Sequence, residues 1–397
     1  MPIESVQRKP VTVVVSGPPG GALGGMASVC RQMEMPGFCG RFRLVFEPFT
    51  LSDSPRRFLV FSIGRHLRQL ARWIGTLRRQ GALIVHLHTC SGFSFYRSAL
   101  DMVLARWMRC RTVLHIHGAR FDEFFRGEPT WRRWLISKIL AQADRVIALS
   151  QGWQERLENL APDARVTVIE NAVDEPGIVE RAAHHGPCHF IMLARMDDWK
   201  GVEELLDAGA ILKRRGVAFR LTLAGPPGSA GDSSTIAGQI AERGLKESVR
   251  YVGPLHGEDK ERLFVSADVY VQPSRHEGMP LAVLEAMAHG LPIVATAVGA
   301  VPEVVEPHRI GLLVPARDPT ALADALQSLA NDAEGRTRMG QEARALAGRR
   351  FSVTRFQADL QSLYVELVGA AAQPGRTKTR LRPWVPVEDV HHPAVES

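Results

Sequence analysis

The sequence predicts an α/β protein with two doubly wound domains of similar size. Along most of its 397 residues, apolar runs rich in β-branched side chains alternate with stretches of helical periodicity. This alternation is typical of βαβ units, which form parallel sheets covered by helices. It stops at a polar segment, 175–188, and then begins again, so this segment is the predicted linker. Hydrophobic residues make up 45% of the chain and charged residues 23%, which is enough apolar material for two cores.

The first half contains five runs that favour strands. Helical patterns lie between them at 26–33, 98–108 and 131–143, and an amphipathic helix is predicted at 56–80. The five strand-like runs are 11–17, 83–88, 112–118, 145–150 and 165–171.

The second half repeats the pattern. Its strand-like runs are 188–195, 219–225, 249–254, 269–274 and 292–297, and its helical stretches are 201–215, 233–244, 258–266, 281–289 and 319–330. We therefore expect an N-terminal domain over 1–180 and a C-terminal domain over 181–370. The proline- and charge-rich tail, 371–397, is predicted to be disordered.

Composition excludes several kinds of protein. The five cysteines are scattered and form no CxxC pair, so neither a disulfide framework nor a zinc site is indicated. The N-terminus lacks the apolar core of a signal peptide, and no run reaches the roughly 18 apolar residues of a transmembrane helix. We therefore expect a cytoplasmic protein, or one attached to the inner face of the cytoplasmic membrane.

The net charge of +7 is concentrated in the first half of the chain. Residues 1–182 carry +9 and the remaining residues −2, and the segment 41–111 alone carries +10. Basic patches attract phosphate backbones. However, the sequence has no helix-turn-helix cue, no RNP-like aromatic strand and no zinc-finger spacing, so we expect no nucleic-acid partner.

The helix predicted at 56–80 bears arginines beside apolar side chains. Arg65, Arg68 and Arg72 recur at helical spacing, and Trp73 adds an interfacial aromatic ring. Such a helix is typical of contact with an anionic membrane surface. The alternative is an ordinary solvated helix face on a cytosolic domain.

Two doubly wound domains hold a ligand in the cleft between the carboxyl ends of their strands. After the first strand, Gly20, Gly21, Gly24 and Gly25 would let the backbone approach a ligand, and the following helix offers free N–H groups to phosphate. The spacing matches neither a dinucleotide fingerprint nor a P-loop, so neither kind of binding follows.

In the second half, Arg195 ends a strand and Lys200 precedes a helix. Two fixed positive charges at a strand end suit a pyrophosphate leaving group. Taken singly, either residue would be interpreted as an ordinary surface cation.

Two glutamates follow the strand at 269–274. Glu277 lies on the loop at the predicted mouth of the cleft, and Glu285 lies in the helix that opens at Pro280, a favoured first helical position. A carboxylate five residues into that helix is about 7 Å further along its axis. One ligand with a sugar at one end and a ribose at the other would span this distance.

Several motifs occur in a fixed order along the chain. They are GGALGG (20–25), HLH (86–88), HIHG (115–118), ADRVIALS (143–150), VIENAVD (168–174), LARMDDWKG (193–201), LTLAGPPG (221–228) and the E-x7-E block that begins EGMPLAVLEAMA (277–288). Over residues 10–365 the chain resembles the retaining GT-B glycosyltransferases of glycosyltransferase family 4. The resemblance implies two Rossmann-like domains, a nucleotide-sugar donor bound mainly by the C-terminal domain, and an acceptor bound by the N-terminal domain.

The resemblance also implies roles for individual residues. Arg195 and Lys200 would contact the diphosphate, Glu277 the donor sugar near its reacting carbon, and Glu285 the ribose hydroxyls. His117 would face the donor sugar. The remaining donor-binding positions are Gly24, Gly25, Gly278, Met279 and Leu281.

We expect no metal. The sequence lacks the DxD triplet that holds a metal–diphosphate in the other main glycosyltransferase fold. The pairs His86/His88 and His115/His117 could suggest a metal, but each alternates along a strand without a clustered acidic partner. Buried or substrate-contacting histidines are the better interpretation.

The acceptor is less well specified than the donor. The arginine-bearing helix favours a lipid-linked saccharide acceptor in bacterial-type cell-surface polysaccharide assembly. The alternatives are a soluble small-molecule acceptor, or a non-catalytic subunit that binds a nucleotide sugar. The sequence does not distinguish a uridine from a guanosine donor.

Overall fold

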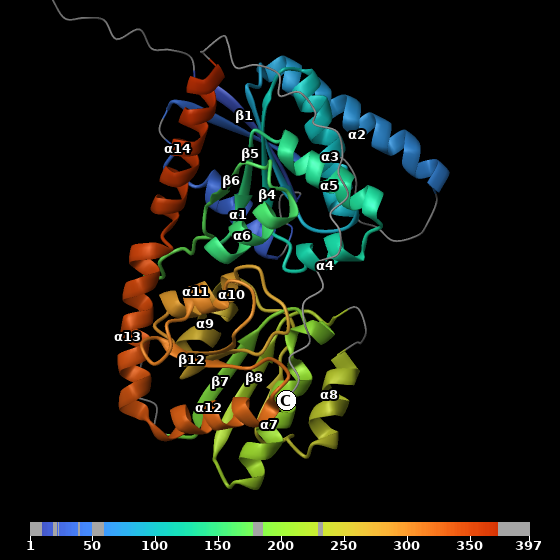
Figure 1. The fold of residues 1–397 in the computed structure, drawn as a ribbon. Helices are drawn as coiled ribbons and strands as arrows, with labels where there is room; N and C mark the ends of the chain where they lie inside the picture. The colour runs from blue at the N-terminus through green and yellow to red at the C-terminus, as the bar shows by residue number, and fades with distance from the viewer. Residues whose placement is uncertain are drawn as a thin grey trace, which may run out of the picture.

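The structure is a computed structural model with two α/β domains (Figure 1). It describes residues 10–18, 22, 24–38, 40–49, 59–177, 186–228 and 233–371, with backbone only at 59–66, 233–234 and 370–371. Most of the predicted linker and nearly all of the predicted tail lie outside the described residues.

Each domain contains a six-stranded sheet in which all the described strand pairs are parallel. The first sheet has the order β2-β1-β3-β4-β5-β6, and its strands are β1 (Val11–Gly17), β2 (Phe42–Pro48), β3 (Ile84–Thr89), β4 (Arg111–Ile116), β5 (Arg145–Ala148) and β6 (Val166–Val168). The second has the order β12-β11-β10-β7-β8-β9, and its strands are β7 (Cys188–Leu193), β8 (Phe219–Ala224), β9 (Val249–Tyr251), β10 (Val269–Gln272), β11 (Ile293–Thr296) and β12 (Gly311–Val314).

Helices cover both sheets. In the first domain they are α1 (Gly25–Glu34), α2 (Leu59–Gln80), α3 (Phe93–Trp107), α4 (Phe121–Gly127), α5 (Thr130–Gln142) and α6 (Gln151–Leu160). The chain then forms a 3-10 turn, η1 (Asp198–Lys200), α7 (Val202–Arg214), α8 (Ser233–Glu242), α9 (Gly257–Ser266), α10 (Leu281–Ala288), α11 (Val301–Val304), α12 (Pro319–Asn331), α13 (Ala333–Arg350) and α14 (Val353–Ala371).

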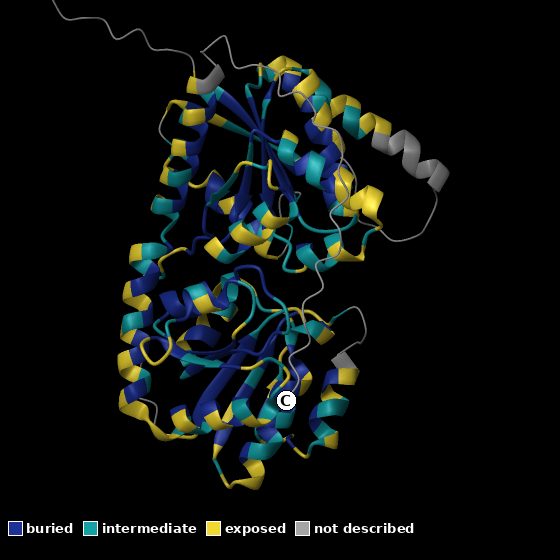
Figure 2. Ribbon diagram, in the orientation of Figure 1, coloured by how far each residue is buried: buried dark blue, intermediate teal, exposed yellow. Residues whose placement is uncertain are grey.

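The strand order divides the helices of the first domain between two faces. The step from β1 to β2 runs in one direction across the sheet, whereas the later steps run in the other. Because such crossovers are right-handed, α1 lies on one face and α2, α3, α5 and α6 on the opposite face. Buried side chains agree, since α1 and α14 share one apolar cluster while α2, α3 and α5 share another. Figure 2 shows the buried sheets between these partly exposed helical layers.

The last helix does not pack where the expected domain boundaries place it. We expected residues 181–370 to form the C-terminal domain, but α14 crosses back and lies along the first sheet (Figure 1). Its apolar face contacts residues of β1 and α1 in one buried cluster, through Phe356, Leu360, Leu363, Tyr364 and Leu367. Among the described helices of the first domain, only α1 lies on that face of the sheet, so α14 completes the layer.

Two strands were not predicted from the sequence. β2 is an edge strand whose middle residues are only half-buried, and its run FRLVFEP shows no clear alternation. β12 is another edge strand of only four residues, GLLV. Short edge strands are stabilised by the sheet beside them rather than by their own pattern.

Candidate active site

Lys200 and Glu277 meet at the carboxyl edge of the second sheet. Lys200 Nζ donates to Glu277 Oε1 at 2.7 Å, although the two residues are 77 positions apart. Glu277 is only 5% exposed, and the Lys200 side chain 15%. Removing two charges from water costs free energy, so a buried ion pair is stable only when each charge is compensated by the other and by further hydrogen bonds.

A buried polar chain supplies those further hydrogen bonds. Gln272, the last residue of β10, donates from Nε2 to the same Glu277 oxygen at 2.7 Å. The Tyr270 hydroxyl donates to Gln272 Oε1 at 2.7 Å, which fixes the orientation of the amide. Among the described residues both donors use Oε1 of Glu277, so Oε2 remains as an acceptor for a ligand hydroxyl.

A glycine brings Lys200 to this position. Gly201 has φ +77°, and a Cβ built there would lie 2.0 Å from the carbonyl oxygen of Pro273, in the loop after β10. The backbone N–H of Arg275 in that loop donates to Trp199 O at 2.8 Å. The loop after β7 and the loop after β10 therefore pack backbone to backbone, and Lys200 reaches Glu277 as a result.

The Glu277 loop also touches the first domain. A Cβ on Gly278 would lie 3.2 Å from the carbonyl oxygen of His117, just beyond β4. The neighbouring Met279 is buried, and its carbonyl accepts from Asn171 Nδ2 at 2.9 Å. On the other side, Gly299 (φ +58°) lies so close to the Glu277 carbonyl that a Cβ would be 1.8 Å from it. The Glu277 loop is thus held between the first domain on one side and the turn after β11 on the other.

The histidines of β3 and β4, together with His117 just beyond β4, form one cluster beneath this contact. His86 lies 2.7 Å from the Tyr364 hydroxyl through Nδ1 and 3.2 Å from His115 Nδ1 through Nε2. His88 Nδ1 lies 2.8 Å from His117 Nε2. Burial lowers the pKa of His86 and of His117 from 6.5 to about 3, and it lowers the pKa of His88 and His115 as well. All four imidazoles are therefore neutral at pH 7, and His117 acts as a hydrogen-bond partner rather than a cation.

Three of these histidines are the one group in the described part of the chain with metal-ligand spacing. One nitrogen from each of His86, His88 and His115 lies within 4.8 Å of the other two. However, the group contains no carboxylate or thiolate to offset a divalent charge, and the bond between His86 and His115 occupies nitrogens that a metal would need. We therefore assign the cluster to the core under the site.

Arg195 and Glu285 lie at the same edge but pair with other partners. Arg195 Nε donates to Asp197 at 2.6 Å, and its side chain is 60% exposed, so it can turn toward a ligand. Glu285, on α10, accepts from Lys260 Nζ at 2.9 Å and is also partly exposed. Lys260 was not predicted from the sequence, yet its ammonium lies at the same edge through this contact with Glu285.

The glycines after β1 lie opposite these loops. Gly24 has φ +115° and no atom within 4 Å of a built Cβ, so its surroundings are open. A Cβ on Gly25, the first residue of α1, would lie 3.6 Å from the side chain of Leu281 at the start of α10. The amino ends of α1 and α10 therefore approach each other where the two domains meet. Gly20 and Gly21 lie outside the described residues.

The structure contradicts one residue of the predicted membrane patch, and membrane contact by the others stays a prediction. Trp73 is 1% exposed and packs with Leu77 under α2, so it is not available to a membrane. Arg68 and Arg72 are exposed, and Arg72 is 71% exposed while 3.9 Å from Glu47. The backbone of Arg65 lies in α2, but its side chain is not described. Among the described helices, none has the length and apolarity to cross a bilayer.

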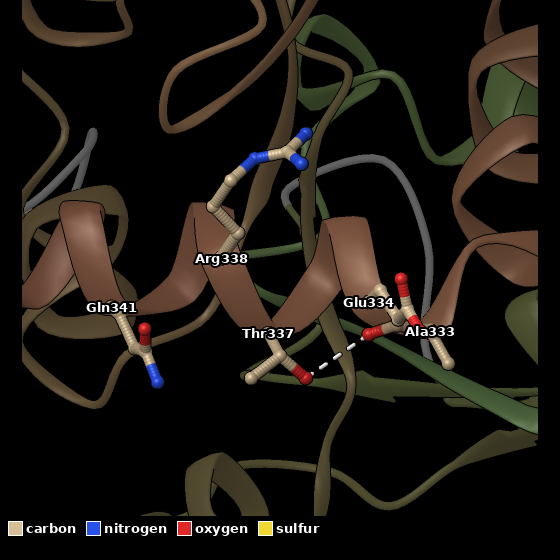
Figure 3. Close-up of a pocket in the computed structure, with 5 residues that line it drawn as sticks. All are labelled: Ala333, Glu334, Thr337, Arg338 and Gln341. Atoms are coloured by element: carbon tan, nitrogen blue, oxygen red, sulfur yellow. Dashed lines mark hydrogen bonds between the residues drawn. The ribbon is translucent and has the colours of Figure 1, made fainter.

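Two hollows lie outside this cluster of loops. One lies on α13 and is lined by Ala333, Glu334, Thr337, Arg338 and Gln341 (Figure 3). Its hydrogen bond, from Thr337 Oγ1 to Ala333 O at 3.0 Å, is internal to the helix. The other, of about 80 Å³, lies between the end of β1, α1 and β2. No predicted site residue lines either hollow.

Family models match most of the chain. Residues 7–172 match the model described as "Glycosyl transferase 4-like domain", and residues 178–346 match "Glycosyl transferases group 1". The first match ends just before the predicted linker, and the second begins within it.

Curated relatives match over a shorter span. A D-inositol 3-phosphate glycosyltransferase of Saccharomonospora viridis is 34% identical over 261 residues, which are 61% of this chain and 60% of the relative. The amylovoran biosynthesis glycosyltransferase AmsK of Erwinia amylovora is 30% identical over 222 residues, which are 52% of this chain and 54% of the relative. The chain thus spans about half to three fifths of the length of these relatives.

Solved structures show the same fold. Sucrose-phosphate synthase from Thermosynechococcus elongatus superposes with a TM-score of 0.77 at 20% identity, covering 91% of this chain and all of that one. HepE from Anabaena, solved with UDP-glucose, gives 0.71 at 19% identity, covering 89% and 99%. The paired domain matches show that the chain belongs to the group 1 glycosyltransferases, and the solved structures show that it has their two-domain GT-B fold.

Proposed function

We propose that the protein is a retaining glycosyltransferase that moves a hexosyl group from a UDP- or GDP-sugar to a lipid-linked saccharide. The observation that carries the proposal is the buried Lys200–Glu277 pair in a loop that touches the opposite domain. A cation and a carboxylate 2.7 Å apart suit a ligand that separates charge as it reacts.

The proposed chemistry uses the two charges at different ends of the donor. As the glycosyl–phosphate bond breaks, negative charge grows on the diphosphate and positive character on the sugar. Lys200 and the exposed Arg195 stabilise the diphosphate, while Glu277 accepts from a sugar hydroxyl through its second oxygen. Glu285 accepts from the ribose hydroxyls.

Retention follows from attack on the face that the phosphate leaves. The acceptor oxygen forms the new bond to the sugar, and its proton passes to an oxygen of the departing diphosphate. Glu277 then forms no covalent intermediate, unlike the nucleophilic carboxylate of a retaining hydrolase. Neutral His117 and the backbone of Gly278 border the sugar from the two domains.

The comparisons support the donor and acceptor classes to different degrees. A structural neighbour was solved with UDP-glucose, which favours a uridine donor. The relative named for amylovoran biosynthesis supports polysaccharide assembly. Several relatives are instead named D-inositol 3-phosphate glycosyltransferases, so transfer to a small soluble acceptor is the second candidate.

Calorimetric titration with UDP, GDP and ADP, and with their sugar conjugates, tests the donor assignment. We expect one nucleotide to bind, and expect Lys200→Ala and Glu285→Ala to weaken it. Lys246→Ala and Glu247→Gln, at exposed positions of the same domain, are matched controls that should bind like the wild type. Failure of every nucleotide to bind would contradict the proposal.

Turnover of a radiolabelled sugar separates an enzyme from a binding subunit. Wild-type protein should transfer or slowly hydrolyse the donor, and Glu277→Gln should lose most of that activity while retaining nucleotide binding. We propose that the reaction needs no metal, so a chelator should leave the rate unchanged. Binding without any turnover would favour the non-catalytic alternative.

A further inference from the structure

The exposed apolar side chains of this protein are concentrated on one layer of helices. Of eleven large hydrophobic residues found exposed among those described, eight lie on α2, α3 or α5. These three helices cover the same face of the first sheet and lie side by side (Figure 1). Scattered exposed apolar residues are ordinary, but a cluster on neighbouring elements indicates a contact surface.

Two helices carry these residues as stripes. On α3, Leu100, Val103 and Trp107 are spaced three and four apart and are 48%, 49% and 75% exposed. On α5, Trp131 and Trp134 are 62% and 48% exposed. Residues at this spacing share one side of a helix, so each stripe points away from the sheet. We call Leu100, Val103, Trp107, Trp131, Trp134 and Leu135 the tryptophan face.

The charge of the same helices is almost entirely positive. The sequences of α2, α3 and α5 contain ten lysines and arginines. They contain a single acidic residue, Asp101, which is 1% exposed. Exposed cations thus border an exposed aromatic surface, with no exposed carboxylate on these helices.

We propose that the tryptophan face docks the protein on an anionic lipid bilayer. Tryptophan prefers the boundary between headgroups and acyl chains, and neighbouring arginines are attracted to anionic headgroups. Arg97 is buried and Arg106 and Arg132 pair with carboxylates of neighbouring elements, but Arg68, Arg72, Arg78 and Arg133 are exposed beside the aromatic rings. This combination of aromatic and cationic side chains fits an anionic lipid surface better than a protein partner, whose own charges would have to match these cations. The inference deepens the proposed function. It rests on that function because a lipid-linked acceptor is what would bring the protein to a membrane.

The tryptophan face takes the place of the apolar side of α2, which the sequence predicted as the membrane contact. Trp73 and Leu77 are buried in the core, so among the described side chains of α2 the outer side carries arginines and one exposed large apolar residue, Leu67. Aromatic insertion must therefore come from α3 and α5.

The position of the face also suits a membrane-borne acceptor. α5 begins just after α4, and Glu123 of α4 lies 3.0 Å from His276, the residue before Glu277. Docking through α5 therefore places the candidate site beside the bilayer surface. An acceptor held in the membrane could reach the site from the α4 side.

Vesicle co-sedimentation of the full chain tests the proposal. The probes are vesicles of phosphatidylglycerol with phosphatidylcholine, and vesicles of phosphatidylcholine alone. We expect salt-sensitive binding to the first only. A triple change of Trp107, Trp131 and Trp134 to serine should weaken that binding roughly tenfold or more. The side chains are exposed, so thermal unfolding should remain like that of the wild type.

A matched control uses the exposed apolar residues outside the face. Met35, Val252 and Val265 are 40%, 45% and 39% exposed, and changing all three to serine should leave vesicle binding unchanged. Equal losses in both triple variants, or no binding by the wild type, would overturn the proposal. So would self-association that the tryptophan changes abolish in sedimentation velocity, because the face would then bind a second copy.

Nucleotide titration of the same variants keeps this proposal separate from the proposed function. The tryptophan-face variant should bind the donor nucleotide like the wild type. Vesicle binding without any nucleotide binding would refute the enzyme assignment and leave the membrane surface standing.

Discussion

At the scale of single residues, the site depends on a glutamine that the sequence did not single out. Gln272 ends β10, and its amide lies between the Tyr270 hydroxyl and Glu277. The sequence predicted Lys200 and Glu277 because charged residues after strands are conspicuous. A glutamine inside an apolar strand has no comparable signal, since its partners are known only once the loops are folded.

Changing Gln272 to methionine should lower turnover more than donor affinity. The change keeps the volume but removes a charge-assisted hydrogen bond, which contributes about 1.5–3 kcal/mol. Glu277 would keep Lys200 and lose its orientation, so we expect kcat to fall roughly tenfold to a hundredfold with KM for the donor nearly unchanged. Steady-state kinetics measure both. Tyr270→Phe removes a contact one step further from Glu277 and should lower kcat less. If Gln272→Met changed KM alone, Gln272 would not have a positioning role.

The histidine cluster predicts how stability depends on pH. Burial lowers the pKa of His86 and His117 from 6.5 to about 3, and lowers that of His88 and His115 too. Below pH 6.5 the unfolded chain takes up protons that the folded chain does not, so unfolding becomes easier. The stabilisation is complete above pH 6.5 and is lost progressively as the pH falls toward 3.

Urea unfolding between pH 5 and pH 7.5 measures this effect. The free energy of unfolding should rise with pH and level off above pH 6.5. His88→Gln removes one of the four groups and should make the slope shallower, even if it lowers stability overall. An unchanged slope would mean that the cluster is not the source of the pH dependence.

At the scale of elements, two loops must pack backbone to backbone for Lys200 to reach Glu277. Gly201→Ala should disrupt this contact, because the new Cβ would lie 2.0 Å from Pro273 O at a φ of +77°. Gly216 has a similar φ of +72° but no atom within 4 Å, so Gly216→Ala carries the backbone strain without the collision. Both changes cost about 1 kcal/mol or more in strain. Only Gly201→Ala should also weaken nucleotide binding in the calorimeter, and equal binding by both variants would refute the loop argument.

The elements themselves were predicted unevenly. Central strands such as β3 and β8 are buried or alternate clearly, so their sequences are distinctive, whereas β2 and β12 are edges whose pairing decides their conformation. The amphipathic pattern of α2 was recognised, but a pattern cannot say what covers the apolar side. Here the protein's own sheet covers Trp73, and solvent-exposed aromatic residues occur instead on α3 and α5.

At the scale of the whole molecule, side chains of the second domain bind the first domain at several points. Glu303 of α11 accepts from Ser150 Oγ at 2.7 Å and from the backbone N–H of Gly152 at 2.9 Å, at the start of α6. Such a carboxylate stabilises the positive end of a helix dipole. Arg350 of α13 in turn donates to Glu170 of the first domain. These contacts hold the two halves of the site together.

The return of α14 leads to a prediction that the order of the sequence would not suggest. Leu360 follows the second sheet in the chain but is fully buried against the first. Leu360→Ala should therefore destabilise the first domain, by about 2–5 kcal/mol if its unfolding is cooperative. Leu329 of α12 is equally buried, in the core of the second domain, and Leu329→Ala is the matched control.

Hydrogen exchange resolved by peptide distinguishes the two domains. Leu360→Ala should raise exchange in β1 and β3, because α14 and α1 together cover that face of the sheet. Leu329→Ala should raise exchange in the second sheet instead. If Leu360→Ala loosened mainly β7 and β8, α14 would belong energetically to the C-terminal domain, and the boundary expected from the sequence would be the better description. We expect the opposite, since no apolar residue of α14 shares the buried cluster of β7 and β8 in the described part of the chain.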